Sequence, residues 1–481
     1  MIDLRDEVRP EDDEQYQETE LLSSERYTSR EWLALEYERL WPYVWQQACR
    51  EEDIPEPGDF HEYTIGKRSI IVLRDDGGQI RAFHNTCMHR GTLLIEGQGN
   101  VRELPCSPGN EGKLQCPFHG WSYNLDGTSH YITGRADFAP GTLDKDSINL
   151  RPVQVDTCNG FVYINMDPNC ISLREWLGPI PEATARFNID KMRTLHHTTI
   201  IVDANWKMAL EQFNEAYHAW TTHIIDMNKV GGVASGAGGR QAGQKPGQIT
   251  PERIMYMFQY RHFERHTLFF QLDWQPTAGL PPISIKDMPG DPREFIGRAL
   301  RHMYEQRRVA PYELEYFDNL TDLPYELDLN GPEFLVWLRR NACDAVGVDL
   351  SHLENEDMFG FVWEFMHFPN TTGPLAGNSY LNLRMRPNGM DPDSCIFEIR
   401  SLFLFPEGQT PAPEREFIAD WKSNQDRIPV EFLQDFAMYP RIQRGLYQDG
   451  FAGHRLNRQE DNNRHYERLI DGYVKGGAGT R

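Results

Sequence analysis

The sequence predicts an α+β protein, because strand-like and helix-like patterns occupy separate parts of the chain. Residues 60–84 alternate apolar and polar side chains around the Gly-rich turn at 75–78, as in a small antiparallel sheet. A helical pattern opens residues 29–50, where Ser29 is the expected N-cap, and another covers 429–447. Longer strand patterns appear in the second half of the chain, at 265–274, 360–370, 380–388 and 395–405.

Length and composition favour a large soluble protein of the cytoplasm. The 481 residues suggest more than one folding unit, and the net charge of -23 argues against nucleic acid or an anionic membrane as the main partner. No apolar run approaches the roughly 20 residues that span a bilayer, and the acidic N-terminus lacks the apolar core of a signal peptide. The eight cysteines show no disulfide pattern, so Cys beside His indicates metal chemistry in a reducing compartment.

Two short loops carry a cysteine and a histidine each. The first is Cys87-Met88-His89-Arg90-Gly91, and the second is Cys116-Pro117-Phe118-His119-Gly120-Trp121. Two Cys and two His can close a tetrahedral zinc site, or hold a [2Fe–2S] cluster with two Cys on one iron and two His on the other. Because each loop mixes the two ligand types, the spacing suits the two-metal cluster.

The stretch 205–223 supplies a second set of ligands, Glu215, His218 and His223. On a helix Glu215 and His218 share a face, whereas His218 and His223 point roughly 140° apart. The two imidazoles can meet on one ion if the helix ends or distorts between them, near the Thr221–Thr222 pair. Two His and one distant carboxylate form the facial triad that binds non-haem Fe(II) and leaves positions open for oxygen.

These motifs together resemble the large (α) subunit of Rieske non-haem iron ring-hydroxylating oxygenases, over roughly residues 40 to 475. The resemblance implies a small antiparallel Rieske β domain and a helix-grip (START-like) catalytic domain, whose long antiparallel sheet wraps around a helix. It divides the chain into an N-terminal lead-in and helix that packs on the catalytic domain (1–40), the Rieske domain (41–165) and the catalytic domain (166–481). It also implies the cluster ligands, with Cys87 and Cys116 on one iron and His89 and His119 on the other.

The third ligand of the mononuclear iron comes from the same resemblance. In the closing helix of the family, an Asp is followed eight positions later by the Gln of Q-x-G-L, and Asp435 with 443–446 matches that arrangement. Asp435 is therefore the expected carboxylate ligand beside His218 and His223. The other candidates are Asp420, Asp426 and Asp449.

Glu215 is expected to act in electron transfer. In the family the cluster of one subunit faces the mononuclear iron of its neighbour in a trimer, and a carboxylate bridges the two centres. The resemblance places Glu215 between His119 of one chain and His218 of the next. Many members have Asp at this position, whereas some relatives that act on non-aromatic or quaternary-amine substrates have Glu, which leaves the substrate class open.

Two segments depart from the family pattern. The stretch between the two ligand loops is longer than usual and contains Cys106, which we interpret as a thiol on an inserted loop, because Gly109 stands where a ligand His would be required. Residues 228–250 are rich in Gly and follow His223 directly. They are either a surface insertion or a mobile lid over the iron pocket.

The resemblance implies the oxygenase component of a multicomponent system, active in the catabolism of aromatic hydrocarbons. It would use O2 for cis-dihydroxylation of an aromatic ring, with electrons from NADH or NADPH through a separate reductase, with or without a ferredoxin. We expect a homotrimer, with or without a small β subunit, and no site for NAD(P)H on this chain. The alternatives are a monooxygenase or demethylase of a terpenoid, steroid or quaternary amine, an electron carrier, and a zinc-stabilised interaction module.

Overall fold

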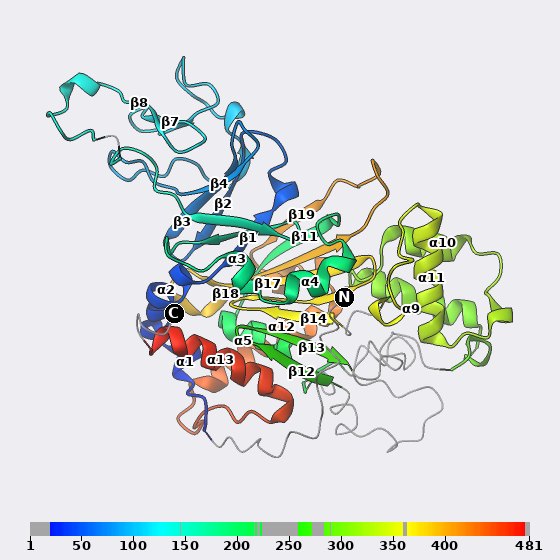
Figure 1. Cartoon of the computed structure of the whole chain (residues 1–481). Helices are drawn as coiled ribbons and strands as arrows, with labels where there is room; N and C mark the ends of the chain where they lie inside the picture. The colour runs from blue at the N-terminus through cyan, green and yellow to red at the C-terminus, as the bar shows by residue number, and fades with distance from the viewer. Residues whose placement is uncertain are drawn as a thin grey trace. The chain divides into compact units, whose positions relative to one another are not determined.

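The computed structural model describes residues 20–144, 146–215, 217–218, 222–223, 258–271, 283–288, 290–358 and 363–476 (Figure 1). The chain divides into two compact units, one formed by Leu35–Trp176 and the other by the residues up to Ala34 together with Leu177–Gly476. The Gly-rich segment 228–250, with its predicted insertion or lid, lies outside the described residues. No helix in the described ranges is long and apolar enough to cross a membrane.

The unit Leu35–Trp176 is built from short antiparallel strands, as the sequence predicts for 60–84. The described strands pair in three sheets, with orders β1-β10-β9, β4-β3-β2-β5 and β6-β7-β8. The predicted turn is held by Asp75, whose carboxylate accepts the backbone N–H groups of Gly77 and Gln79 at 2.9 Å each. The strands are β1 (Gln46–Arg50), β2 (Asp59–Ile65), β3 (Arg68–Arg74), β4 (Ile80–His84), β5 (Gln98–Asn100), β6 (Leu114–Gln115), β7 (Ser122–Tyr123), β8 (Ser129–Tyr131), β9 (Gln154–Cys158) and β10 (Phe161–Asn165).

The long stretch between the two ligand loops contacts other parts of the same unit. Its strand β5 extends the sheet by pairing with β2. Further along, Asn110 is buried and accepts a hydrogen bond from Ser122 Oγ at 2.5 Å. Cys106 is exposed, and all eight cysteines are free. The insertion is therefore part of this unit, and its thiol faces away from the core.

The helical pattern that opens residues 29–50 corresponds to helix α2 (Arg30–Arg39), which follows the short helix α1 (Glu25–Thr28). Ser29 is the N-cap, because its Oγ accepts the Trp32 N–H at 3.1 Å. The helix stops before Trp41-Pro42, where proline cannot continue it, and residues 46–50 form strand β1.

In the second unit, nine of the described strands form one large sheet, with the order β12-β13-β14-β15-β17-β18-β11-β19 and with β16 paired to β14 and β17. All pairs are antiparallel except β11 with β19. The sheet is therefore mixed, a small departure from the expected antiparallel one. The strands are β11 (Arg193–Val202), β12 (Phe258–Phe263), β13 (His266–Gln271), β14 (Trp363–His367), β15 (Thr371–Thr372), β16 (Pro374–Ala376), β17 (Ser379–Asn388), β18 (Asp391–Phe403) and β19 (Glu414–Ile418).

Helix α12 (Val430–Leu446) carries Asp435, and helix α5 (Trp206–Glu211) ends four residues before Glu215. Helix α5 packs on strands β17 and β18. Phe397 of β18 contacts Phe432 and Phe436 of α12, with ring centroids 5.8 and 5.2 Å apart. Both helices thus pack on β18. This packing of helices against the long sheet is the arrangement expected for the catalytic domain.

The remaining helices complete the second unit. A separate apolar core joins α9 (Pro292–Glu305), α10 (Pro311–Asn319) and α11 (Gly331–Ala345). The other α-helices in the described ranges are α3 (Leu173–Leu177), which begins in the first unit, α4 (Ile180–Thr184) and α13 (Asp461–Val474).

Candidate metal centres

The two Cys/His loops close in the same way, although their histidines stand at different offsets. The carbonyl of Cys87 accepts the N–H of Gly91 at 2.9 Å, and the carbonyl of Cys116 accepts that of Gly120 at 3.1 Å. Both glycines adopt a left-handed conformation, with φ of 79° and 76°, which L-residues with a side chain rarely adopt. The glycine in each motif therefore turns the chain back toward its cysteine.

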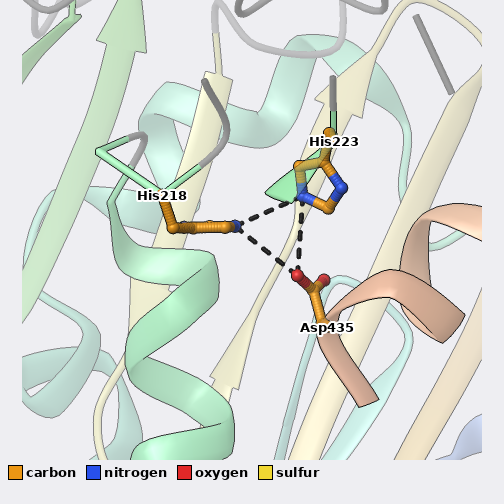
Figure 2. A group of neighbouring side chains, drawn as sticks. All are labelled: His218, His223 and Asp435. Atoms are coloured by element: carbon orange, nitrogen blue, oxygen red, sulfur yellow. Dashed lines mark hydrogen bonds and ion pairs between the residues drawn. The ribbon is translucent and has the colours of Figure 1, made fainter. Parts of the chain in front are cut away.

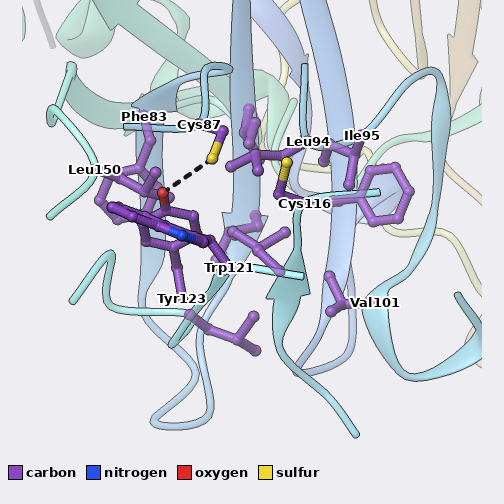
Figure 3. Close-up of a cluster of buried hydrophobic side chains, with 14 of the residues drawn as sticks. Phe83, Cys87, Leu94, Ile95, Val101, Cys116, Trp121, Tyr123 and Leu150 are labelled. Carbon is purple, nitrogen blue, oxygen red and sulfur yellow. Dashed lines mark hydrogen bonds between the residues drawn. The ribbon is translucent and has the colours of Figure 1, made fainter. Parts of the chain in front are cut away.

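The loops bring two thiols and two imidazoles together. Cys87 and Cys116 belong to one buried cluster of side chains and are 3% and 2% exposed (Figure 3). The rings of His89 and His119, which are partly exposed, have centroids 4.7 Å apart. Burial raises the pKa of the Cys87 thiol, so a bound cation is required to hold it as a thiolate in this apolar surrounding.

This donor set fits a two-iron cluster better than a single ion. Around one zinc ion, four ligand atoms would converge on a point. In the described part of the chain, only one group of three or more such atoms lies within 4.8 Å of one another, and it contains none of these four residues. His119 Nδ1 is also buried without a hydrogen-bond partner among the described residues, which leaves it available as a ligand atom.

Two aromatic residues support these loops. Trp121 stacks on His89, with ring centroids 5.1 Å apart and planes at 11°. The Tyr123 hydroxyl lies 3.3 Å from Cys87 Sγ and accepts the N–H of Met88 at 2.9 Å (Figure 3). Tyr123 can therefore donate its proton to the sulfur, a contact that the sequence analysis did not identify.

The second centre consists of His218, His223 and Asp435, whose ligand atoms all lie within 4.8 Å of one another (Figure 2). The two Nε2 atoms are 3.3 Å apart, and Asp435 Oδ1 lies 3.6 Å from His218 Nε2 and 3.5 Å from His223 Nε2. Asp435 Oδ1 is buried, and among the described residues it accepts no hydrogen bond. A buried carboxylate oxygen aimed between two imidazole nitrogens fits a divalent metal ion.

Asp435 is the candidate that the structure brings to the histidines. It lies on α12, is 1% exposed, and burial raises the pKa of its carboxyl. Asp420, Asp426 and Asp449 are exposed. Asp420 caps a short 3-10 helix by accepting the N–H of Lys422 at 3.1 Å.

The prediction that Glu215 and His218 share a helix face is wrong. Helix α5 ends at Glu211, and after the 3-10 turn Gln212–Asn214 the backbone at Glu215 is extended, with φ of -149° and ψ of 162°. The carboxylate of Glu215 accepts the backbone N–H groups of Tyr217 and His218, as a helix N-cap does, and so starts a new turn. The break thus lies before both histidines, and between them the N–H of Thr222 donates to the carbonyl of His218 at 2.9 Å.

Each histidine of the triad has a different partner on its other ring nitrogen. Glu215 Oε1 lies 2.5 Å from His218 Nδ1, and this contact raises the pKa of His218 to about 9 against the opposing effect of burial. Gln434 Oε1 lies 2.6 Å from His223 Nδ1. Gln434 was missed by the sequence analysis, because its position beside Asp435 carries no signal until the two segments are brought together.

Two family models match the segments that contain these candidate centres. Residues 44–139 match the family model described as Rieske [2Fe-2S] domain. Residues 189–282 and 294–476 match the model described as ring hydroxylating alpha subunit (catalytic domain), which covers more than half of the chain. The predicted α+β class and the recognised family are thus confirmed.

One relative that matches this chain is named as a monooxygenase subunit. The methanesulfonate monooxygenase hydroxylase subunit alpha of Methylosulfonomonas methylovora is 33% identical over 206 residues, or 42% of this chain. That match spans 49% of the relative, so this chain covers about half the length of the relative.

Two solved structures share the fold. The quaternary ammonium Rieske monooxygenase CntA in complex with an inhibitor superposes with a TM-score of 0.60 at 16% identity, over 94% of this chain and 95% of that one. Naphthalene 1,2-dioxygenase from a Rhodococcus species gives 0.55 at 18% identity, over 95% of both chains. The chain belongs to the Rieske non-haem iron oxygenases, as a member of the ring-hydroxylating alpha subunit family, which uses a [2Fe–2S] cluster and a mononuclear iron.

Proposed function

We propose that this chain is the oxygenase component of a multicomponent Rieske system, with its irons on the residues described above. Cys87 and Cys116 hold one iron of the cluster, and His89 and His119 hold the other. His218, His223 and Asp435 hold the mononuclear iron. The observation that carries the proposal is the convergence of these last three side chains, with all their ligand atoms within 4.8 Å.

When bound, the cluster supplies electrons one at a time, and the mononuclear iron supplies the activation of O2. The chain provides the surroundings for this chemistry. Asp435 offers a buried carboxylate whose Oδ1 accepts no hydrogen bond from the described residues, and three protein ligands leave coordination positions open. Glu215 and Gln434 each contact the outer nitrogen of one histidine, which directs both Nε2 atoms toward the same point.

The reaction that we favour is hydroxylation of an aromatic ring, as cis-dihydroxylation, in aromatic catabolism. It is supported by membership of the ring-hydroxylating family and by the shared fold with a naphthalene dioxygenase. The substrate would then be small and apolar.

The alternative is monooxygenation or demethylation of a non-aromatic substrate, such as a terpenoid, a steroid or a quaternary amine. Two observations favour it. A matched relative is named for methanesulfonate, and a structural neighbour for quaternary ammonium compounds. Glu215 is also the residue type that some non-aromatic members carry in place of Asp. The same two centres serve either reaction, and the position of the substrate decides between them.

Electrons would reach the cluster from NADH or NADPH through a separate reductase, with or without a ferredoxin, in the cytoplasm. We propose a homotrimer, with or without a small β subunit. In that assembly Glu215 would accept a hydrogen bond from His119 of a neighbouring copy while it holds His218, and so link the two centres. The proposal is compatible with its position, because Glu215 Oε1 already contacts His218 Nδ1 at 2.5 Å.

The test is a reaction assay with the full-length protein, a surrogate reductase, NADH and isotopically labelled O2. Panels of aromatics, terpenoids and quaternary amines are screened by substrate loss and product mass. Two labelled oxygens in one product indicate dihydroxylation, and one indicates monooxygenation. A colourless protein that contains zinc and no acid-labile sulfide would overturn the proposal, and so would cluster iron without mononuclear iron.

A further inference from the structure

Helix α12 contacts both ring nitrogens of His223 through two consecutive residues. Asp435 Oδ1 lies 3.5 Å from Nε2, and Gln434 Oε1 lies 2.6 Å from Nδ1. Consecutive helical side chains diverge by roughly 100°, so the imidazole lies between them. Gln434 is half-buried, which limits competition from water for this hydrogen bond.

The position of the proton on His223 follows from the other nitrogen. Nε2 faces His218 Nε2 at 3.3 Å and the carboxylate of Asp435, so a lone pair on Nε2 is needed to bind a metal there. The proton must then sit on Nδ1, and the group that faces Nδ1 must be an acceptor. The amide oxygen of Gln434 meets this requirement, whereas the amide nitrogen in that place would set a donor against a donor. Metal binding and the orientation of Gln434 therefore require each other.

The two histidines are held in the same tautomer by different chemistry. The acceptor at His218 Nδ1 is the carboxylate of Glu215 at 2.5 Å, and the acceptor at His223 Nδ1 is a neutral amide. A carboxylate acceptor makes an imidazole a stronger electron donor, while an amide fixes its orientation without adding charge. The site thus has one charged and one neutral outer contact.

We propose that Gln434 is a positioning residue for the mononuclear iron, which holds His223 in the tautomer and orientation that present Nε2 to the metal. The proposal rests on the proposed function in one respect, namely that a divalent metal binds between His218, His223 and Asp435.

The experiment measures Co(II) binding to protein that keeps its oxidised cluster but has been depleted of mononuclear iron. Gln434→Met keeps the length of the side chain and removes the amide oxygen. Gln434→Glu restores an acceptor and adds charge, which serves as the conservative rescue. Gln448→Met makes the same chemical change at an exposed residue that contacts no ligand, since its amide donates to the carbonyl of Arg444.

Loss of the acceptor should weaken Co(II) binding by roughly 10- to 100-fold, the usual cost of removing an outer contact of a ligand. We expect this loss in Q434M, restored binding in Q434E and wild-type binding in Q448M, all with unchanged cluster absorption. The EPR spectrum of bound Co(II) should also broaden in Q434M, because the His223 ring is no longer held in one orientation. The oxidised cluster is diamagnetic and does not mask that signal.

The outcomes separate this inference from the function on which it rests. If D435A loses Co(II) binding while Q434M binds with wild-type affinity and an unchanged EPR spectrum, the role of Gln434 is refuted and the metal site stands. If D435A binds Co(II) as the wild type does, the assignment of the metal site is refuted, and the inference about Gln434 with it.

Discussion

Replacement of Glu215 by Gln tests whether the site needs both carboxylate oxygens of Glu215. One oxygen of Glu215 accepts the backbone N–H groups of Tyr217 and His218, and the other contacts His218 Nδ1 at 2.5 Å. A glutamine has only one oxygen. In either orientation its NH2 group must face a donor, so the variant keeps the turn or the imidazole contact but not both.

The cost can be worked from that geometry. A hydrogen bond to a charged acceptor contributes about 1.5–3 kcal/mol, and 1.4 kcal/mol corresponds to tenfold in a binding constant. E215Q should therefore bind Fe(II) at the mononuclear site roughly 10- to 100-fold more weakly, in line with other lost outer contacts of metal ligands. Glu407→Gln, at an exposed residue of the same unit, makes the same chemical change and should bind Fe(II) as the wild type does.

The assay combines an anaerobic Fe(II) titration with single-turnover kinetics. At saturating Fe(II), after chemical reduction of the cluster, we expect its reoxidation with substrate and O2 to be orders of magnitude slower in E215Q. Reoxidation at the wild-type rate would show that Glu215 positions His218 but does not link two centres. An unchanged affinity for Fe(II) as well would refute the argument from the contact between Glu215 and His218.

Three further predictions follow from other buried groups. Cys116→Ser should abolish the visible absorption of the cluster and Cys106→Ser should leave it unchanged, because Cys116 is buried in the core between the two loops and Cys106 is exposed; a coloured C116S protein or a colourless C106S protein would contradict the ligand assignment. Tyr123→Phe should keep the cluster but lower its reduction potential in protein-film voltammetry. The variant lacks the hydroxyl 3.3 Å from Cys87 Sγ, which stabilises the negative charge that the cluster gains on reduction; an unchanged potential would show that this contact does not affect the potential of the cluster. Burial raises the pKa of Glu211 well above 4.5, so the folded protein keeps a proton that the unfolded chain loses above about pH 4.5. Relative to Glu211→Gln, the stability of the wild type should therefore fall as pH rises above about 4.5, by at most about 1.4 kcal/mol per pH unit. The melting temperature of Glu211→Gln should rise relative to that of the wild type over the same range; a difference that does not vary with pH would contradict the reasoning.

Much of the fold could be predicted because local patterns agree with the tertiary structure. The strands at 60–84, the N-cap at Ser29 and the helix at 429–447 all follow from alternation, capping and helical periodicity. The Cys/His loops were recognisable because their ligands lie within a few residues of each other. Each motif also contains the glycine that its turn requires.

One of the features that were missed is local, and the other two depend on segments that are distant in sequence. The break at Glu215 could not be read from helical periodicity, because the carboxylate of Glu215 competes for backbone N–H groups and starts a new turn. Gln434 has no local signal, since its partner His223 lies 211 positions away. The parallel pairing of β19 with β11 likewise joins distant segments.

The most direct test of the account is the count of iron and acid-labile sulfide per chain in the wild type and in Asp435→Ala. Two centres predict about three irons and two sulfides in the wild type, given one [2Fe–2S] cluster and one mononuclear site. D435A should keep both sulfides, the cluster absorption and about two irons, because Asp435 belongs only to the second centre. Three irons and full turnover in D435A would contradict the assignment of the mononuclear site, and so would a wild-type protein with no sulfide.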